Sequence, residues 1–158
     1  MIYTNIIHSP LGLVHLVASI IAMLTGIIVI LKGAKGSKTH KRIGYIYVFS
    51  MLLLNGTAFG IYNFGSFSMF HFFSIVSLAS ITTGMLPMIF NFSNKMRFHY
   101  RFMSWSVVGL YAAFVAEIFT RFIRFDYFWV AVMIGTIAVS AVGGYLIEKN
   151  AKRFLKSS

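Results

Sequence analysis

The stretch PLGLVHLVASIIAMLTGIIVILK, residues 10–32, carries no charged side chain before its last residue. A helix needs roughly 20 consecutive apolar residues to cross the hydrocarbon core of a bilayer, and this stretch is long enough to do so. It opens with Ser9-Pro10, which is typical of a helix start because proline at the first helical position lacks only an N–H group that would be unpaired there. These residues predict a membrane-spanning helix.

Four more apolar segments of spanning length follow along the chain. The sequence is 58% hydrophobic, well above the roughly 45 to 50% that is usual in soluble domains. Pro87 falls inside the third segment, where it should kink the helix or mark an early end. Because little polar sequence separates the segments, residues 1–158 are expected to form one all-α transmembrane bundle. The five predicted spans lie near residues 10–32, 42–62, 69–92, 102–121 and 127–147.

The charged residues are concentrated between the apolar segments. Three acidic residues stand against 14 lysine and arginine residues. Because the basic residues form short clusters rather than one face of a soluble domain, we expect them to contact anionic lipid headgroups and not nucleic acid. With five spans, all three clusters fall on one side. The positive-inside rule makes that side cytoplasmic, so the N-terminus is expected outside and the C-terminus inside. The clusters are Lys32, Lys35, Lys38, Lys41 and Arg42; Lys95, Arg97 and Arg101; and Lys149, Lys152, Arg153 and Lys156.

Histidine is the main candidate ligand type, because the chain has no cysteine. In the predicted topology, His15 and His71 lie near the outer ends of the first and third spans. His40 and His99 lie at the inner starts of the second and fourth spans. The sequence therefore predicts two histidines near each face of the membrane.

A weak internal repeat relates two helical hairpins of the sequence. Thr25-Gly26 in the first hairpin matches Thr83-Gly84 in the second, and each hairpin has one histidine before this pair and another after the basic loop. Parallel repeats related by an axis along the membrane normal would bring the first span opposite the third and the second opposite the fourth. The expected fold is therefore a four-helix core of two repeated hairpins plus one C-terminal helix.

This arrangement predicts two bis-histidine haem b groups stacked across the membrane. His15 and His71 would hold the iron of the outer haem, and His40 and His99 the iron of the inner one. Two axial imidazoles leave haem iron for electron transfer rather than oxygen binding. The leading hypothesis is a membrane oxidoreductase or electron carrier of the cytochrome b kind, which moves electrons between a quinol or another reductant on one side and an acceptor on the other.

Two other functions stay open. The chain has almost no extramembrane mass to bind a soluble substrate, so the alternative is a non-catalytic accessory or assembly subunit of a larger inner-membrane respiratory or secretion complex. A small transporter or lipid-binding protein, in which paired histidines bind a metal ion or a proton, is less favoured. Few polar groups besides Asn55 lie near the predicted bilayer midplane, where transport usually needs them.

The first basic loop carries a motif, KGSKTHKRIGYIY at residues 35–47. Its order of Lys-Gly, a short gap, histidine, basic residues, glycine and tyrosine resembles that of the bacterial predicted membrane proteins of domain of unknown function 2306. The resemblance implies a small multi-span protein of the bacterial cytoplasmic (inner) membrane and brings no established activity. The matching residues are Lys35, Gly36, His40, Lys41, Arg42, Gly44 and Tyr47.

The alternation of the histidines is also similar, more distantly, to the cytochrome b561 superfamily. In that superfamily a four-helix core carries two haems, each held by histidines from helices two apart in order. The resemblance implies the pairs His15 with His71 and His40 with His99. The sequence has no obvious ascorbate site, so the resemblance does not identify the electron donor.

Overall fold

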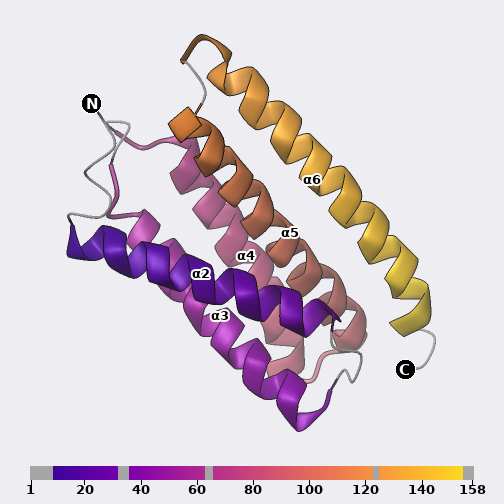
Figure 1. The fold of residues 1–158 in the computed structure, drawn as a ribbon. Helices are drawn as coiled ribbons and strands as arrows, with labels where there is room; N and C mark the ends of the chain where they lie inside the picture. Colours follow the sequence, from indigo (N-terminus) through magenta and orange to yellow (C-terminus); the bar gives the residue numbers. More distant parts are fainter. Residues whose placement is uncertain (1–8, 32–35, 63–65, 123–124, 155–158) are drawn as a thin grey trace. The chain divides into compact units, whose positions relative to one another are not determined.

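The computed structural model describes residues 9–31, 36–62, 66–122 and 125–154 of the chain. These residues form five helices and no strand (Figure 1). The prediction of an all-α protein is confirmed. The helices are α2 (Pro10–Leu31), α3 (Lys38–Ala58), α4 (Met69–Ile89), α5 (Lys95–Phe122) and α6 (Phe125–Phe154).

Helix α2 begins where the sequence predicts. The backbone N–H of Gly12 donates to Oγ of Ser9 at 3.0 Å, and the backbone N–H of Leu13 donates to the Ser9 carbonyl oxygen at 3.1 Å. Ser9 thus satisfies two of the N–H groups that a helix start leaves unpaired. The buried residues of α2 are small, which lets a neighbouring helix approach its backbone closely. These residues are Gly12, Ala18, Ala22 and Gly26.

Helix α3 begins at Lys38, earlier than the predicted span near residue 42. Ser37 caps the helix, because its Oγ accepts the backbone N–H of His40 at 3.2 Å. Lysine and arginine are good helix formers, so a basic cluster marks the edge of the membrane and not the end of the helix. His40 therefore lies in the first turn of α3.

Helix α5 also begins earlier than predicted, at Lys95 instead of near residue 102. The turn before it uses two asparagines with positive φ, Asn91 (56°) and Asn94 (60°). The carbonyl oxygen of Asn94 accepts the backbone N–H of Arg97 at 3.0 Å, which starts the helix. His99 therefore lies inside α5 rather than at its start.

Helix α4 contains Pro87 in its last turn and ends at Ile89, before the predicted end near residue 92. The backbone N–H of Phe92 donates to the Pro87 carbonyl oxygen at 3.1 Å and closes the turn that follows. Proline removes one helical donor and its ring crowds the preceding turn. The prediction that Pro87 marks an early end is confirmed.

Four of the described helices are long and apolar enough to cross a membrane: α2, α4, α5 over Lys95–Phe119 and α6 over Trp129–Lys152. Helix α3 is long enough but carries basic residues in its first turns. Large apolar side chains such as Leu24 (59% exposed) and Ile134 (64% exposed) point outward. Outward apolar faces of this extent match a lipid environment, and the chain is an all-α membrane protein.

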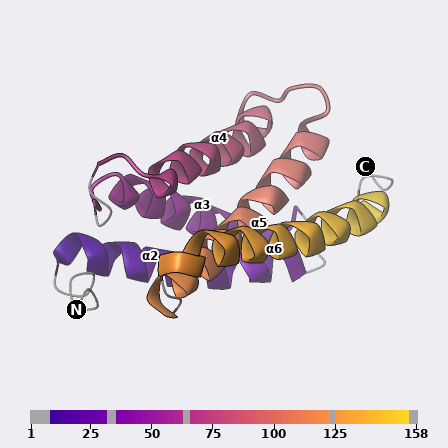
Figure 2. The same ribbon diagram turned by 90° about the horizontal axis from the view of Figure 1, so that it is seen from above.

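The structure has two compact units, residues 1–78 and 79–158, whose boundary falls inside α4. Within the first unit α2 packs along α3, and within the second α5 packs along α6 (Figures 1 and 2). Tyr47 and Met51 of α3 are each 1% exposed and belong to the core of the first unit. The single bundle and the relation between the two repeated hairpins stay predictions.

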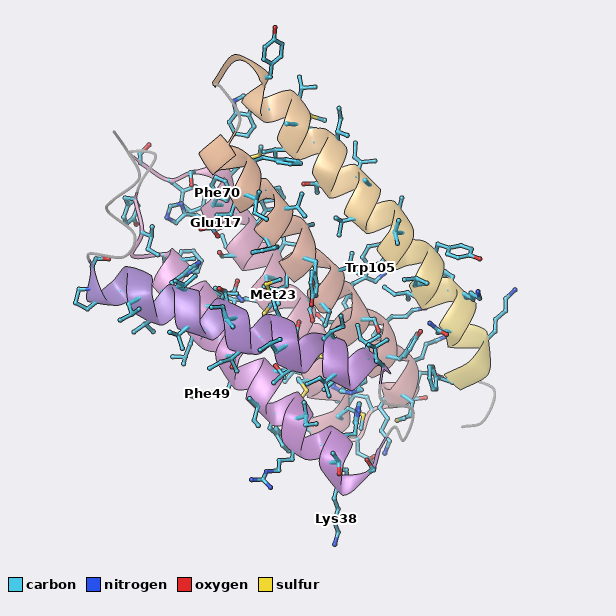
Figure 3. The ribbon with its side chains drawn as sticks, in the orientation of Figure 1. Met23, Lys38, Phe49, Phe70, Trp105 and Glu117 are labelled. Carbon is cyan, nitrogen blue, oxygen red and sulfur yellow. The ribbon has the colours of Figure 1, made fainter. Side chains whose placement is uncertain are left out.

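Glycines of α6 allow it to approach α5 closely. A Cβ atom on Gly143 would lie 2.4 Å from Cγ2 of Val108, and one on Gly144 would lie 3.2 Å from Cη2 of Trp105. Figure 3 shows Trp105 reaching from α5 toward α6. Larger residues at these positions would push the two helices apart.

Two polar contacts join the first half of α5 to the last part of α6, where both helices carry basic residues. The Tyr100 hydroxyl donates to the Ile147 carbonyl oxygen at 2.9 Å. One residue further along each helix, Nη2 of Arg101 lies 3.2 Å from Oε1 of Glu148. These side chains are 46% and 63% exposed, so the ion pair adds little stability. The two contacts define how far α6 is shifted along α5.

Candidate functional site

All four histidines predicted as ligands lie in described helices. His15 in α2, His40 in α3 and His71 in α4 belong to the first unit, and His99 in α5 belongs to the second. His15, His40 and His99 are half-buried, whereas His71 is buried. The pairing of His40 with His99 therefore stays a prediction, whereas His15 and His71 both belong to the first unit.

His15 is held by a residue from the neighbouring helix. Its Nδ1 lies 3.0 Å from Oγ1 of Thr57 in α3. The Thr57 hydroxyl has a backbone acceptor in the Leu53 carbonyl oxygen at 2.8 Å, which leaves its oxygen able to accept from Nδ1 of His15. In a neutral imidazole one nitrogen is protonated and the other has the lone pair. In the tautomer protonated at Nδ1, the lone pair of His15 is on Nε2.

His71 is held by its own helix cap. Its Nδ1 lies 3.0 Å from the backbone nitrogen of Ser68 and 2.9 Å from its Oγ. The Ser68 carbonyl oxygen accepts the backbone N–H of His71, so Ser68 is the residue from which α4 starts. This is one half of a capping box, with histidine in place of the usual glutamate or glutamine three residues after the cap. His71 thus has a structural role of its own.

The cap also fixes the protonation of the His71 ring. A backbone N–H can only donate, so Nδ1 of His71 must accept and Nε2 must carry the proton. His71 is 2% exposed, and Nε2 is buried with no hydrogen-bond partner among the described residues. The result is a buried N–H donor without an acceptor.

Aromatic rings surround His71 at the end of α3 and in the residues before α4. The ring centroids of Tyr62, Phe67 and Phe59 lie 4.9, 5.1 and 6.1 Å from that of His71. Phe67 is stacked on His71 with an angle of 27° between the ring planes. Because His15 contacts Thr57 and His71 contacts Phe59, the structure brings both histidines of the outer pair to the same end of α3.

The two histidines differ as possible haem ligands. An axial imidazole needs a lone pair on the nitrogen that faces the iron, and its other nitrogen usually donates a hydrogen bond to an oxygen acceptor. His15 has this arrangement. His71 presents an N–H group at Nε2, so its hydrogen bonding does not fit the predicted axial role.

His99 resembles His15 and not His71. Its Nδ1 lies 3.1 Å from the carbonyl oxygen of Gly84 in α4. A carbonyl can only accept, so Nδ1 of His99 carries the proton and the lone pair of the neutral ring is on Nε2. Gly84 makes this contact possible because a Cβ atom there would lie 2.9 Å from Sδ and 3.3 Å from the backbone nitrogen of Met103, one turn beyond His99. The glycine of the Thr-Gly pair noted in the sequence thus brings α4 close to α5.

Among the described residues, no group of three or more His, Asp or Glu side chains is placed to hold a metal ion. Structural and catalytic zinc sites use three or four protein ligands. A haem needs only one or two axial ligands.

The partners of these histidines were not predicted from the sequence. Ser68 could have been found, because Ser-x-x-His at the start of an apolar helix has the spacing of a capping box. Thr57 could not, because it lies 42 residues from His15 in the sequence. Asn55, which the sequence singled out as polar, is 4% exposed. Its Nδ2 donates to the Met51 carbonyl oxygen and to Oγ of Ser77, at 2.7 and 3.1 Å.

Comparison with known proteins supports the membrane assignment. The family model of DUF2306, described as a predicted membrane protein, matches residues 12–149. This range contains the four histidines and all but the ends of the five helices. Comparisons with curated proteins and with solved structures give no match. The match covers most of the chain, and the chain belongs to the DUF2306 family of predicted membrane proteins.

Proposed function

We propose that this chain is a haem-containing membrane protein of the cytochrome b kind, which carries electrons across a bacterial cytoplasmic membrane. The observation that carries the proposal is the hydrogen bonding of His15 and His99. His99 donates Nδ1–H to the Gly84 carbonyl oxygen at 3.1 Å, and Nδ1 of His15 lies 3.0 Å from Thr57 Oγ1, which can accept in the same way. Metal-bound histidines typically have this arrangement, because it orients the ring and makes Nε2 a better ligand.

Five spans support this function better than four. Helix α3 has 21 residues, which is about 32 Å at 1.5 Å per residue and enough to cross the hydrocarbon core. Its basic residues all lie in the first turns, where they reach anionic headgroups. Counting α3 as a span leaves the three basic clusters on the cytoplasmic side and the N-terminus outside. His15 then lies near the outer face and His99 near the inner face.

The chain's own residues would hold and orient the haem, and haem iron would supply the one-electron chemistry. Thr57 and the Gly84 carbonyl set the orientation of His15 and His99. His40 is the predicted second ligand beside His99. His71 carries a proton on Nε2 instead of a lone pair, so of the two outer histidines only His15 would hold a haem.

The test is a reduced-minus-oxidised absorbance spectrum of the full chain, purified in mild detergent after expression with ample haem, with haem quantified against protein. We expect the α band of a low-spin b haem. The variants His15→Ala and His99→Ala should each lower the haem content. His8→Ala is the matched control, since His8 precedes the first span, and it should change nothing.

A wild-type spectrum without a haem band would overturn the proposal. The same holds if His15→Ala and His99→Ala both retain the full haem content of the wild type. In either case, copurification with a larger membrane complex becomes the measurement to make, because it tests the accessory-subunit alternative.

A further inference from the structure

The capping role of His71 explains its Nδ1 and leaves its Nε2 unexplained. Nε2 carries a proton, is buried, and has no acceptor among the described residues. Buried donors in folded proteins are nearly always paired, and an unpaired one calls for a specific explanation such as a bound molecule. The capping box itself needs only an acceptor at this position, which glutamate or glutamine would supply. The proton on Nε2 is therefore available to a ligand.

The surroundings of His71 limit what that ligand can be. Among the described residues, those with a ring contact or hydrogen bond to His71 are Phe59, Tyr62, Phe67 and Ser68, none of which is charged. Without a counter-charge, a buried anion or cation would be strongly unfavourable here. The flat aromatic rings favour a flat partner that stacks on them. The ligand should therefore be neutral, planar and able to accept a hydrogen bond.

The site also has a route to the membrane. Tyr62 and Phe67 are 56% and 61% exposed, although they cover the buried His71 ring. A ligand dissolved in the outer part of the bilayer would reach Nε2 by displacing one of these two side chains. His71 lies in the first turn of α4, which is the outer end of that helix in the predicted topology.

We propose that His71 donates a hydrogen bond from Nε2 to the ring carbonyl of a quinone and is not an axial ligand of haem. A quinone is neutral, has a flat ring with carbonyl acceptors, and dissolves in the bilayer. The binding site does not depend on haem. Only the role of the quinone as electron donor or acceptor rests on the proposed function.

The test uses the full chain in lipid nanodiscs, with decylubiquinone as the probe and calorimetry as the measurement. Empty nanodiscs of the same lipid composition correct for partition of the probe into the bilayer. The haem content of each sample is measured in parallel. Haem content and decylubiquinone binding are thus measured separately on the same preparation.

Two variants of His71 separate the possible roles of the ring. His71→Gln keeps an oxygen that accepts the Ser68 N–H and an amide N–H that can donate to a carbonyl, but it has no imidazole for iron. His71→Ala lacks both groups. His8→Ala is the matched control. We expect His71→Gln to bind decylubiquinone within about threefold of the wild type and His71→Ala to bind it about tenfold more weakly, as for one lost hydrogen bond.

The haem content of the two variants shows whether His71 is a hydrogen-bond donor to a quinone or an axial ligand of haem. If His71 is the donor, both variants keep the wild-type haem content. If both lose haem relative to the wild type, His71 is an axial ligand and the proposal is wrong. It is also wrong if wild-type and empty nanodiscs take up the same amount of decylubiquinone, because a water molecule then satisfies Nε2. If the wild type contains no haem, only the proposed function is contradicted. The comparison of decylubiquinone binding still tests the quinone site.

Discussion

The α2–α3 hairpin and the first turn of α4 hold two histidines of the same unit in opposite ways. In the hairpin, Nδ1 of His15 meets a hydroxyl of the neighbouring helix, whose oxygen can accept from it. In the first turn of α4, His71 accepts at Nδ1 from a backbone N–H of its own cap. The partner therefore decides which nitrogen carries the proton. One ring is suited to bind a metal and the other to donate a hydrogen bond.

The second unit repeats the first of these two arrangements. His99 donates from Nδ1 to the Gly84 carbonyl oxygen, and the Thr57 oxygen is placed to accept from Nδ1 of His15 in the same way. The acceptors are chemically different, a backbone carbonyl and a side-chain hydroxyl. Only the hydroxyl can be removed by substitution, and this makes His15 the easier of the two to test.

The largest expected effect is on His15 when its acceptor is removed. Thr57→Val deletes the hydroxyl that orients the ring, and loss of such a partner typically weakens metal binding by about 10- to 100-fold. We therefore expect haem titration of this variant to show a correspondingly weaker site. Thr25→Val is the control, because the Thr25 hydroxyl donates only to carbonyl oxygens of its own helix, Ile21 at 2.6 Å and Ala22 at 3.3 Å. Equal haem affinity in the two variants would contradict the role given to Thr57.

A second effect should appear at the contact that serves His99. Gly84→Ala places a Cβ 3.3 Å from the backbone nitrogen of Met103, so α5 has to shift and the bond to His99 should lengthen. Overpacking of this kind costs about 1 to 3 kcal/mol, offset in part by the better helix propensity of alanine. We expect a lower melting temperature in detergent. Gly109→Ala is the matched control, because a Cβ there meets nothing within 4 Å.

Gly109→Ala should be neutral or slightly stabilising, since it gains helix propensity without a clash. If both variants melt at the same temperature, the close approach at Gly84 does not constrain the packing of α5. Haem content measured on the same samples shows whether any shift of α5 reaches His99.

The protonation pattern itself can be measured by ¹⁵N NMR of the histidine rings. We expect His15 and His99 to carry the proton on Nδ1, and His71 to carry it on Nε2. Finding His71 protonated on Nδ1 would remove the distinction between the two regions and restore His71 as a candidate axial ligand.

The smallest expected effect follows from Ser68→Ala. The variant removes the Ser68 hydroxyl but keeps the backbone N–H that fixes the His71 ring. The loss of one hydrogen bond should cost about 0.5 to 1.5 kcal/mol, and His71 should stay protonated on Nε2. A change of the protonated nitrogen in this variant would show that the hydroxyl, and not the backbone, controls the ring.

The sequence predicted the apolar helices well because membrane-spanning length is a property of the local sequence. The capped start at Ser9-Pro10 and the early end at Pro87 were predicted for the same reason. Helices α3 and α5 start at Lys38 and Lys95, before the spans predicted near residues 42 and 102, because the basic residues that precede the apolar segments are still helical. Helix propensity, and not charge, sets these ends.

The histidines were visible in the sequence, but the protonation of their rings was not. It depends on the group that meets Nδ1, and for His15 and His99 that group lies 42 and 15 residues away. The spacing of Ser68 and His71 is short enough to be read from the sequence as a capping box. That spacing is the one sign in the sequence that His71 differs from the others.

The lengths of α5 and α6 have a consequence for the lipid around them. The two helices have 28 and 30 residues, about 42 and 45 Å at 1.5 Å per residue, whereas the hydrocarbon core is about 30 Å thick. A helix longer than the core is accommodated by tilt or by polar ends that extend beyond the core. The Arg101–Glu148 pair lies toward the basic end of both helices. A bilayer with longer acyl chains should draw this pair toward hydrocarbon, where separating the two charges costs more than in water. Acyl-chain length then becomes a variable that tightens or loosens the contact between α5 and α6.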